Sequence, residues 1–147
     1  MFEDDQRLGE MLAVLRQAGR IAVFDFEKRV PAASRFSVSA DEQERAVFPE
    51  LTKALRLSEK IAEGEVVFIR TPKVIEVNYA GNLRYPYLGQ ANTSEWYSDK
   101  YDEVYDDYRL VGGNSDFGGL ASLFYCWYGA HYSRIAFRPL VVFPSKT

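Results

Sequence analysis

The aromatic residues of this chain are unevenly distributed, and this asymmetry constrains the fold more than any other feature. All ten tyrosines and both tryptophans lie between Tyr79 and Tyr132, whereas the first 78 residues carry aliphatic side chains, charges and phenylalanine. Tyr and Trp offer large, stiff and amphipathic surface at low entropic cost, so they suit both half-buried core positions and binding surfaces. The second half of the chain is therefore expected to hold either a tyrosine-rich core or a recognition surface.

The length of 147 residues is sufficient for one hydrophobic core and too short for two domains of ordinary size. Hydrophobic residues at 47% and charged residues at 27% are the proportions of a globular protein rather than of a disordered or fibrous chain. The sequence shows neither an internal repeat nor a linker. We therefore expect a single domain over residues 1–147.

Charge and hydropathy argue against several classes of partner. Eighteen Lys and Arg against 21 Asp and Glu give a formal charge of −3, so no basic surplus favours nucleic acid or anionic lipid. The acidic start lacks the pattern of a secretory signal, and no apolar run reaches the roughly 18 residues that a membrane span needs. The single cysteine, Cys126, suits a reducing compartment. The expected location is the cytoplasm or a phage or virus particle.

Two helices are predicted in the first half. Apolar residues spaced three and four apart predict a helix over residues 4–18. A capping box formed by Ser39 and Glu42 predicts the start of a second helix, which would have a break or a late start at Pro49 and continue to about Glu63. The glycines placed to end the two helices are Gly19 and Gly64.

Short strands are expected around these helices, and a long irregular region after them. The abundance of Gly, Asn and Pro from Gly81 onward predicts irregular structure up to a last strand that contains Pro139 and that Pro144 would end. Ordered loops of such length tend to be functional. The four predicted strands are Arg20–Phe26, Glu65–Arg70, Lys73–Val77 and Ile135–Phe143.

Few residues are candidates for catalysis or metal binding. Cys126 and His131 could pair to activate a thiolate, but a lone cysteine among aromatic neighbours is more often a small buried hydrophobe. One His and one Cys also leave a zinc site short of ligands. We therefore assign no catalytic residue, metal ligand or required cofactor. An acidic run interleaved with tyrosines is either a solvated face or a calcium site; it comprises Asp99, Asp102, Glu103, Asp106 and Asp107.

Three blocks occur in order in the last third of the chain. They are Asn92-Thr-Ser-Glu-Trp-Tyr-Ser-Asp-Lys-Tyr-Asp102, Tyr108-Arg-Leu-Val-Gly-Gly-Asn-Ser-Asp116 and Ile135-Ala-Phe-Arg-Pro-Leu-Val-Val142. Together with Tyr85-Pro-Tyr87, they resemble the closing part of the formylglycine-generating-enzyme (sulfatase-modifying factor) branch of the C-type lectin fold, over residues 84–143. The resemblance implies an α+β, C-type lectin-like domain with two helices, small antiparallel sheets and a long irregular loop region.

The resemblance also implies structural roles for individual residues. Gly112 and Gly113 would form a close turn, and Trp96 and Phe137 would anchor the core. Arg109 and Arg138 would bind carboxylates such as Glu95. The chain departs from the family in lacking the pair of cysteines with which its oxidases hold copper. It also lacks the family's opening motif and its Leu-Pro-Thr-Glu-Ala-Glu-Trp-Glu helix, whose place a helix around residues 41–63 could take.

A second group with this fold, the variable proteins of diversity-generating retroelements, is similar in the character of its C-terminal stretch. In that group the stretch is rewritten at adenine-rich codons, and the altered residues form a binding face. Between Asn114 and Phe137 the chain has no Lys, Glu, Gln or Met, and Trp127 is the only residue that a mutated Asn codon does not give. An aromatic, loop-rich segment with few long charged side chains is the alternative interpretation of this pattern.

The expected function is non-catalytic recognition of a protein or glycan surface by the aromatic C-terminal face. The alternatives are an enzyme or enzyme accessory of the formylglycine-generating type that uses Cys126 and His131, or a structural subunit of a viral or phage assembly with the aromatic half as a contact in a homo-oligomer. The predicted binding residues are Asn114, Asp116, Phe117, Phe124, Tyr125, Tyr128, His131 and Tyr132.

Overall fold

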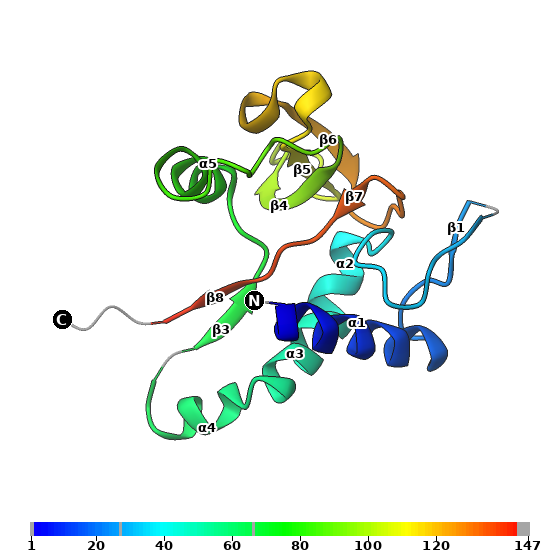
Figure 1. The fold of residues 1–147 in the computed structure, drawn as a ribbon, viewed down its shortest axis with the longest axis vertical. Helices are drawn as coiled ribbons and strands as arrows, with labels where there is room; N and C mark the ends of the chain where they lie inside the picture. The colour runs from blue at the N-terminus through cyan, green and yellow to red at the C-terminus, as the bar shows by residue number, and fades with distance from the viewer. Residues whose placement is uncertain (1, 27, 66, 144–147) are drawn as a thin grey trace.

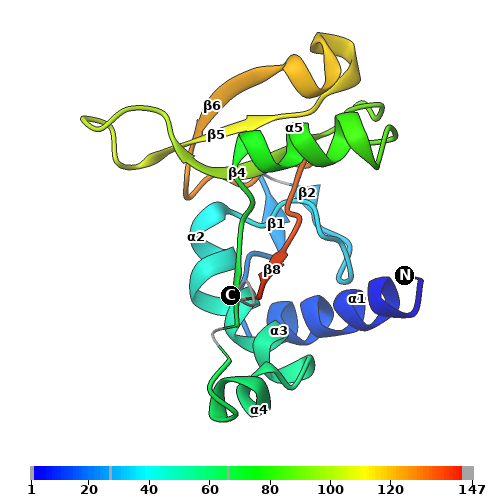
Figure 2. The same ribbon diagram turned by 90° about the vertical axis from the view of Figure 1, so that its left-hand side faces the viewer.

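The computed structural model describes residues 2–26, 28–65 and 67–143. The chain has a mixed α+β fold in two layers (Figures 1 and 2). One layer contains the helices of the first half, and the other contains a four-stranded sheet with one further helix beside it. None of the helices in these ranges is long and apolar enough to cross a membrane.

Helix α1 (Phe2–Gln17) confirms the first predicted helix. Its apolar stripe faces the core, where Leu12 and Leu15 are buried. The helix ends before Gly19, whose φ of +71° lies in the left-handed region that favours glycine. The predicted helix and its C-terminal stop are therefore both present.

The second predicted helix is divided into short pieces. Its capping box is present, because the Ser39 hydroxyl accepts the N–H of Glu42 and the Glu42 carboxylate accepts the N–H of Ser39, each at 3.1 Å. Of the two alternatives predicted at Pro49, the late start is present: α3 begins at Phe48, and Pro49 lies in its first turn, where its missing N–H costs no hydrogen bond. The break lies at Arg56, with φ of +54°. The pieces are α2 (Ala40–Glu42), the π-helical η1 (Gln43–Val47), α3 (Phe48–Ala54) and α4 (Leu57–Ala62).

Residues 94–136 contain more regular structure than their turn residues predict. The sheet order is β6-β5-β4-β7, with β4, β5 and β6 antiparallel and β7 parallel to β4. Two single-turn 3-10 helices, η2 (Ser115–Phe117) and η3 (Gly119–Ala121), connect β5 to β6. The strands are β4 (Ser94–Lys100), β5 (Tyr108–Gly112), β6 (Leu123–Trp127) and β7 (Ile135–Ala136).

The remaining strands form two small pairs. The hairpin β1 (Phe24–Asp25) and β2 (Lys28–Arg29) replaces the longer strand predicted over residues 20–26. The pair β3 (Phe68–Arg70) and β8 (Leu140–Val142) joins the middle of the chain to its last described strand. The strand predicted over residues 135–143 is thus split between two sheets, with Pro139 in the gap. Its predicted end at Pro144 lies outside the described residues.

The strand predicted over Lys73–Val77 is wrong, because these residues begin helix α5 (Val74–Leu83). The Glu76 carboxylate accepts the backbone N–H of Lys73 at 2.7 Å and so stabilises the first turn. Arg70 donates two hydrogen bonds to the same carboxylate. These polar contacts outweigh the strand preference of the β-branched residues in a short apolar run.

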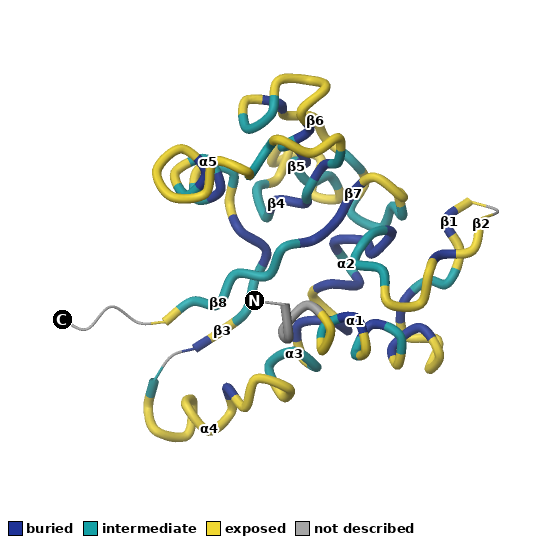
Figure 3. The backbone as a smooth tube through the Cα atoms, in the orientation of Figure 1, coloured by how far each residue is buried: buried dark blue, intermediate teal, exposed yellow. Residues whose placement is uncertain are grey.

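Trp96 and Phe137 are fully buried and join the two layers, which confirms both as core anchors. The indole N–H of Trp96 donates to the carbonyl of Val38 at 3.1 Å, so a strand of the sheet is tied to the segment before α2. The Phe137 ring contacts Phe48 of α3 edge-on, at a centroid distance of 6.4 Å. Figure 3 shows the buried segments concentrated where the sheet meets α2.

Gly112 and Gly113 form the predicted close turn. A Cβ atom on Gly112 would lie 2.1 Å from the carbonyl oxygen of Ser122, and Gly113 has φ of +86°. Glycine is required at position 112 for the close approach and is favoured at position 113 by the positive φ. The turn brings the chain from β5 toward η2 and then β6, each of which carries two of the eight predicted binding residues.

Candidate binding surface

Strand β6 does not present its aromatic residues on one face. Phe124 pairs with the fully buried Val111 of β5, whereas Tyr125 pairs with Leu110. Because side chains alternate along a strand, Phe124 and Cys126 lie on the face toward Val111, and Tyr125 lies on the opposite face. The prediction that Phe124 and Tyr125 share one binding face is therefore wrong.

Four tyrosines gather at one end of the sheet, and we call them the tyrosine cluster: Tyr101, Tyr105, Tyr108 and Tyr125. The rings of Tyr101 and Tyr125 stack with centroids 4.0 Å apart. Tyr108 contacts Tyr125 at 5.7 Å and Tyr105 at 6.2 Å, both edge-on. The exposed fractions of Tyr101, Tyr105 and Tyr125 are 47%, 56% and 50%, so the cluster is a solvent-facing surface.

The cluster is assembled from three segments of the chain. Tyr101 and Tyr105 lie in the connection between β4 and β5, which projects from the sheet in Figure 2, and Tyr108 begins β5. Tyr125 lies in the middle of β6. Trp127 of β6 is exposed and pairs with Tyr108 across the two strands, so it extends the cluster along the same face.

Acidic residues surround the tyrosine cluster. The ammonium group of Lys100 pairs with the carboxylate of Asp106, and this contact lowers the pKa of Asp106 below its usual value. Asp102 accepts the N–H of Val104 at 3.0 Å, and Asp99 accepts the N–H of Val74 at 2.7 Å. Within the described ranges, no three His, Cys, Asp or Glu side chains come together as a metal site. The acidic side chains of this run thus accept local hydrogen bonds and pair with Lys100, at a solvated edge of the tyrosine cluster.

Asn114 is a structural residue rather than a surface contact. It is only 4% exposed, and its side-chain oxygen accepts the N–H of Asp116 at 2.9 Å, which caps η2. Asp116 and Phe117 follow on η2 and are both exposed. Neither belongs to the tyrosine cluster.

Tyr128 and His131 are directed toward the helical layer. Tyr128 contacts the core, and the guanidinium of Arg109 lies 5.7 Å from the centre of its ring. His131 Nε2 lies 2.9 Å from Oε2 of the buried Glu42 carboxylate. Tyr132 instead contacts Phe26 at the β1–β2 hairpin, at 5.8 Å. The eight predicted residues are therefore dispersed, and Tyr125 alone among them joins the tyrosine cluster.

The Glu42 carboxylate is a junction between the layers. It accepts the backbone N–H groups of Ala22 and Ser39, at 2.8 Å and 3.1 Å. Burial acts to raise the pKa of Glu42, but His131 and these two N–H groups outweigh it, so the pKa lies below its usual value. The network holds Glu42 ionised in the folded protein.

Cys126 and His131 do not form a hydrogen-bonded pair in the described structure. Burial raises the pKa of the Cys126 thiol, which favours the protonated form over the nucleophilic thiolate. His131 is directed at Glu42 instead. This arrangement gives no support to a thiolate mechanism.

The resemblance correctly identified one ion pair and misplaced another. Arg138 donates two hydrogen bonds to Glu95, from Nε at 2.8 Å and Nη2 at 2.6 Å. Arg109 does not contact Glu95; its Nη1 donates to the backbone carbonyl of Asp106 at 2.5 Å. Arg109 therefore supports the connection that carries Tyr101 and Tyr105.

Sequence reasoning did not include Tyr101, Tyr105, Tyr108 and Trp127 among the predicted binding residues, although it interpreted the acidic run around the three tyrosines as a solvated face or a calcium site. Their spacing along the chain does not show that these four residues share a surface. Tyr101, Tyr105 and Tyr108 alternate with the acidic run, and Trp127 lies on a different strand, β6. The signal would have been the pairing of residues 108–112 with 123–127, which places Tyr108 opposite Trp127. No protein-family model, curated protein or solved structure matches this chain.

Proposed function

We propose that the protein is a non-catalytic recognition domain that binds a protein surface through the tyrosine cluster and Trp127. The observation that carries this proposal is the convergence of three exposed tyrosines, from the β4–β5 connection and β6, around the half-buried Tyr108 of β5. Tyr and Trp are the residues that most often dominate binding energy in protein interfaces. A soluble domain rarely leaves so many large aromatic rings together in water without a partner.

The arrangement of the rings favours binding. Tyr101, Tyr108 and Tyr125 contact one another in the free protein, so their side chains are already ordered before a partner arrives. Ordering a side chain on binding costs about 0.5–1.5 kcal/mol, and pre-ordered rings avoid most of that cost. The paired strands β5 and β6 hold Tyr108 and Tyr125 on a rigid base.

The charges around the cluster indicate the chemistry of the partner. Asp102, Glu103 and Asp107 accompany the tyrosines, and Lys100 is occupied by Asp106. An apolar surface edged by negative charge complements a partner with Lys or Arg at its rim. Arginine also stacks on tyrosine faces, so a basic protein surface matches both features.

The proposal includes a C-type lectin-like architecture. It is supported by the buried Trp96 and Phe137, the Glu95–Arg138 ion pair and the turn at Gly112. Helix α5 is a better counterpart than residues 41–63 for the family's Leu-Pro-Thr-Glu-Ala-Glu-Trp-Glu helix. Like that motif, it follows a proline and carries a glutamate in its first turn, here Pro72 and Glu76.

We extend the proposal to diversification of the exposed positions in residues 114–132. Asp116, Phe117 and Tyr125 are exposed, whereas the core anchors Trp96 and Phe137 are buried, so surface changes need not disturb the core. Sequencing this gene's 3′ third from a clonal population tests the idea. Changes confined to codons for exposed residues would support it, and a constant stretch would refute diversification while leaving the binding surface in place.

The binding proposal is tested with Tyr101→Ser, Tyr105→Ser and Tyr125→Ser combined in one variant. A matched control changes exposed tyrosines outside the cluster, Tyr79→Ser and Tyr85→Ser. Partners captured by the tagged wild-type chain are quantified for both variants, after thermal unfolding has shown that each is folded. We expect the partner to be lost with the cluster variant and retained with the control. Equal capture by both variants would refute the proposed surface.

A further inference from the structure

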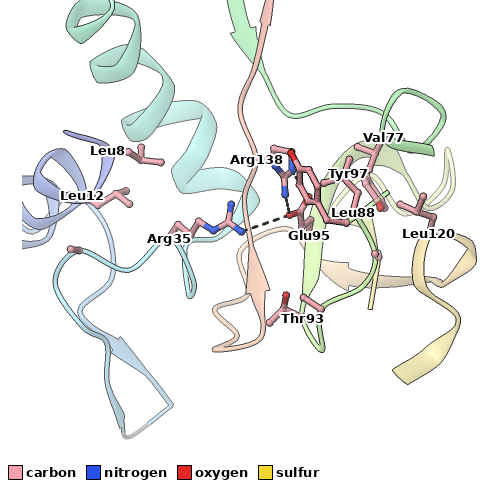
Figure 4. A pocket seen from close by; sticks show the side chains of 16 residues that line it. Leu8, Leu12, Arg35, Val77, Leu88, Thr93, Glu95, Tyr97, Leu120 and Arg138 are labelled. Atoms are coloured by element: carbon pink, nitrogen blue, oxygen red, sulfur yellow. Dashed lines mark hydrogen bonds and ion pairs between the residues drawn. The ribbon is translucent and has the colours of Figure 1, made fainter. Parts of the chain in front are cut away.

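A cavity of about 490 Å³ lies between the helical layer and the sheet, away from the tyrosine cluster. Figure 4 shows Leu8 and Leu12 of α1 on one side, and Leu88, Leu120 and Val77 on the other. The volume is in the range of pockets that hold small organic molecules. The apolar side chains on both sides suit a ligand with an apolar body.

The charges in this cavity do not balance. Its charged lining residues are Arg35, Arg138 and Glu95. Arg138 and Glu95 neutralise each other through their two hydrogen bonds. Arg35 Nη2 lies 3.9 Å from Glu95 Oε1, and its guanidinium donates no hydrogen bond to any residue within 6–26, 28–65 and 67–143. Among the lining residues that the structure describes, one guanidinium is therefore in excess, and Arg35 is directed toward the ion pair in Figure 4.

Tyr97 provides a hydroxyl that opens onto the cavity. The residue is only 1% exposed, it lines the cavity, and its hydroxyl has no hydrogen-bond partner within residues 6–26, 28–65 and 67–143. Although the residue as a whole is buried, its hydroxyl is not enclosed by protein, so it is available to a molecule in the cavity. A Cβ atom on Gly113 would lie 3.6 Å from this hydroxyl, so the glycine leaves it open. Burial, followed by the charge of Glu95, raises the pKa of Tyr97 to about 12, so the group is a hydrogen-bond donor at neutral pH.

We propose that this cavity binds a small organic monoanion, a carboxylate with an apolar body. The Arg35 guanidinium binds the carboxylate, whose planar geometry matches the guanidinium fork. The Tyr97 hydroxyl donates to a polar atom of the ligand, and the leucines enclose the apolar body. One excess positive charge matches a monoanion and leaves a dianionic phosphate group incompletely balanced. The site shares no residue with the tyrosine cluster, so it goes beyond the proposed recognition function.

The test uses three probes of the same shape: 2-naphthoate, its neutral amide 2-naphthamide and the cation 2-naphthylmethylammonium. Binding is followed by NMR of protein with ¹³C-labelled tyrosine rings, in which Tyr97 reports on the cavity and Tyr101 on the cluster. We expect saturable shifts at Tyr97 with 2-naphthoate. The anion should bind at least about tenfold more tightly than the amide, the ratio that one charge-assisted hydrogen bond supplies.

Variants locate the binding. Arg35→Gln should abolish the preference for the anion, whereas Arg29→Gln makes the same charge change on β2 and should preserve it. Ala91→Trp, which places a ring in the lining, should weaken both the anion and the amide. Tyr97→Phe should weaken the anion severalfold while the chain remains folded.

Three results would overturn the proposal. They are the absence of saturable shifts at Tyr97 in the wild-type protein, equal binding of anion and amide, and binding that survives both Arg35→Gln and Ala91→Trp. The first is measured on the unaltered chain and does not depend on how the variants fold. None of these results bears on the tyrosine cluster, whose variants are tested separately.

Discussion

Tyr101 and Tyr125 stack with their ring centroids 4.0 Å apart and their planes inclined by 28°. Tyr101 lies in the connection between β4 and β5, whereas Tyr125 lies on β6. The contact fixes the connection between β4 and β5 against β6. It is therefore both part of the proposed binding surface and a link within the fold.

A double-mutant cycle on Tyr101 and Tyr125 measures this link. We expect Tyr101→Ala and Tyr125→Ala to interact by about 0.5–1.5 kcal/mol in the free energy of unfolding, the range for aromatic pairs. Urea denaturation of the wild type, both single variants and the double variant gives the value. Strictly additive effects would show that the rings do not stack in solution.

Loss of Arg138 should destabilise the fold more than loss of the whole ion pair. Arg138→Met leaves the largely buried Glu95 carboxylate without its two hydrogen bonds, so we expect a cost of about 2–3 kcal/mol. Adding Glu95→Gln removes the negative charge that Arg138→Met leaves without its partner, and it should recover part of the lost free energy of unfolding. Urea denaturation measures both effects, and a double variant less stable than Arg138→Met would contradict the expectation.

Stability should fall in acid through Glu42. Its pKa is below the unfolded value in the folded protein, so its contribution is fully present above the unfolded pKa of about 4.3. That contribution is lost as the pH falls from there through the lower, folded-state pKa. Glu42→Gln should be less stable at pH 7, and the difference from the wild type should shrink toward pH 2. A difference that is constant with pH would contradict the role of the ionised carboxylate.

The thiol of Cys126 should react slowly. Because burial raises its pKa, we expect alkylation by iodoacetamide at pH 7.5 to be much slower in the folded protein than in urea. Mass spectrometry over time follows the labelling. Labelling of the folded protein as fast as that of the unfolded chain would contradict the protected position and favour the enzyme alternative.

Local patterns were sufficient to predict parts of the fold. The periodicity of residues 4–18 and the capping box at Ser39 depend on neighbours along the chain, and both are present. The core positions of Trp96 and Phe137 followed from the resemblance to a known family. Helix α5 was missed because Val74, Ile75 and Val77 favour strands, whereas the contact of Glu76 with Arg70 that stabilises the helix requires the folded chain.

The binding surface was harder to predict because strand register is not local. A shift of one residue reverses the face of every side chain on a strand, and the pairing of β5 with β6 decides that Tyr125 faces Tyr101 while Phe124 faces the core side. Composition showed that the second half of the chain is rich in tyrosine. It did not distinguish the exposed Tyr101 from the buried Tyr97, which lies on the adjoining strand β4.

Site-specific photocrosslinking tests the central claim most directly. A benzophenone amino acid replaces Tyr125 in one version of the chain and the exposed Ser58 of α4 in a control version, both made in the source cells. We predict a discrete crosslinked product at position 125 that is absent at position 58. Excess wild-type protein should compete it away, whereas the Tyr101→Ser, Tyr105→Ser, Tyr125→Ser variant should not. A product of equal yield at both positions, or none at position 125, would contradict recognition through the tyrosine cluster.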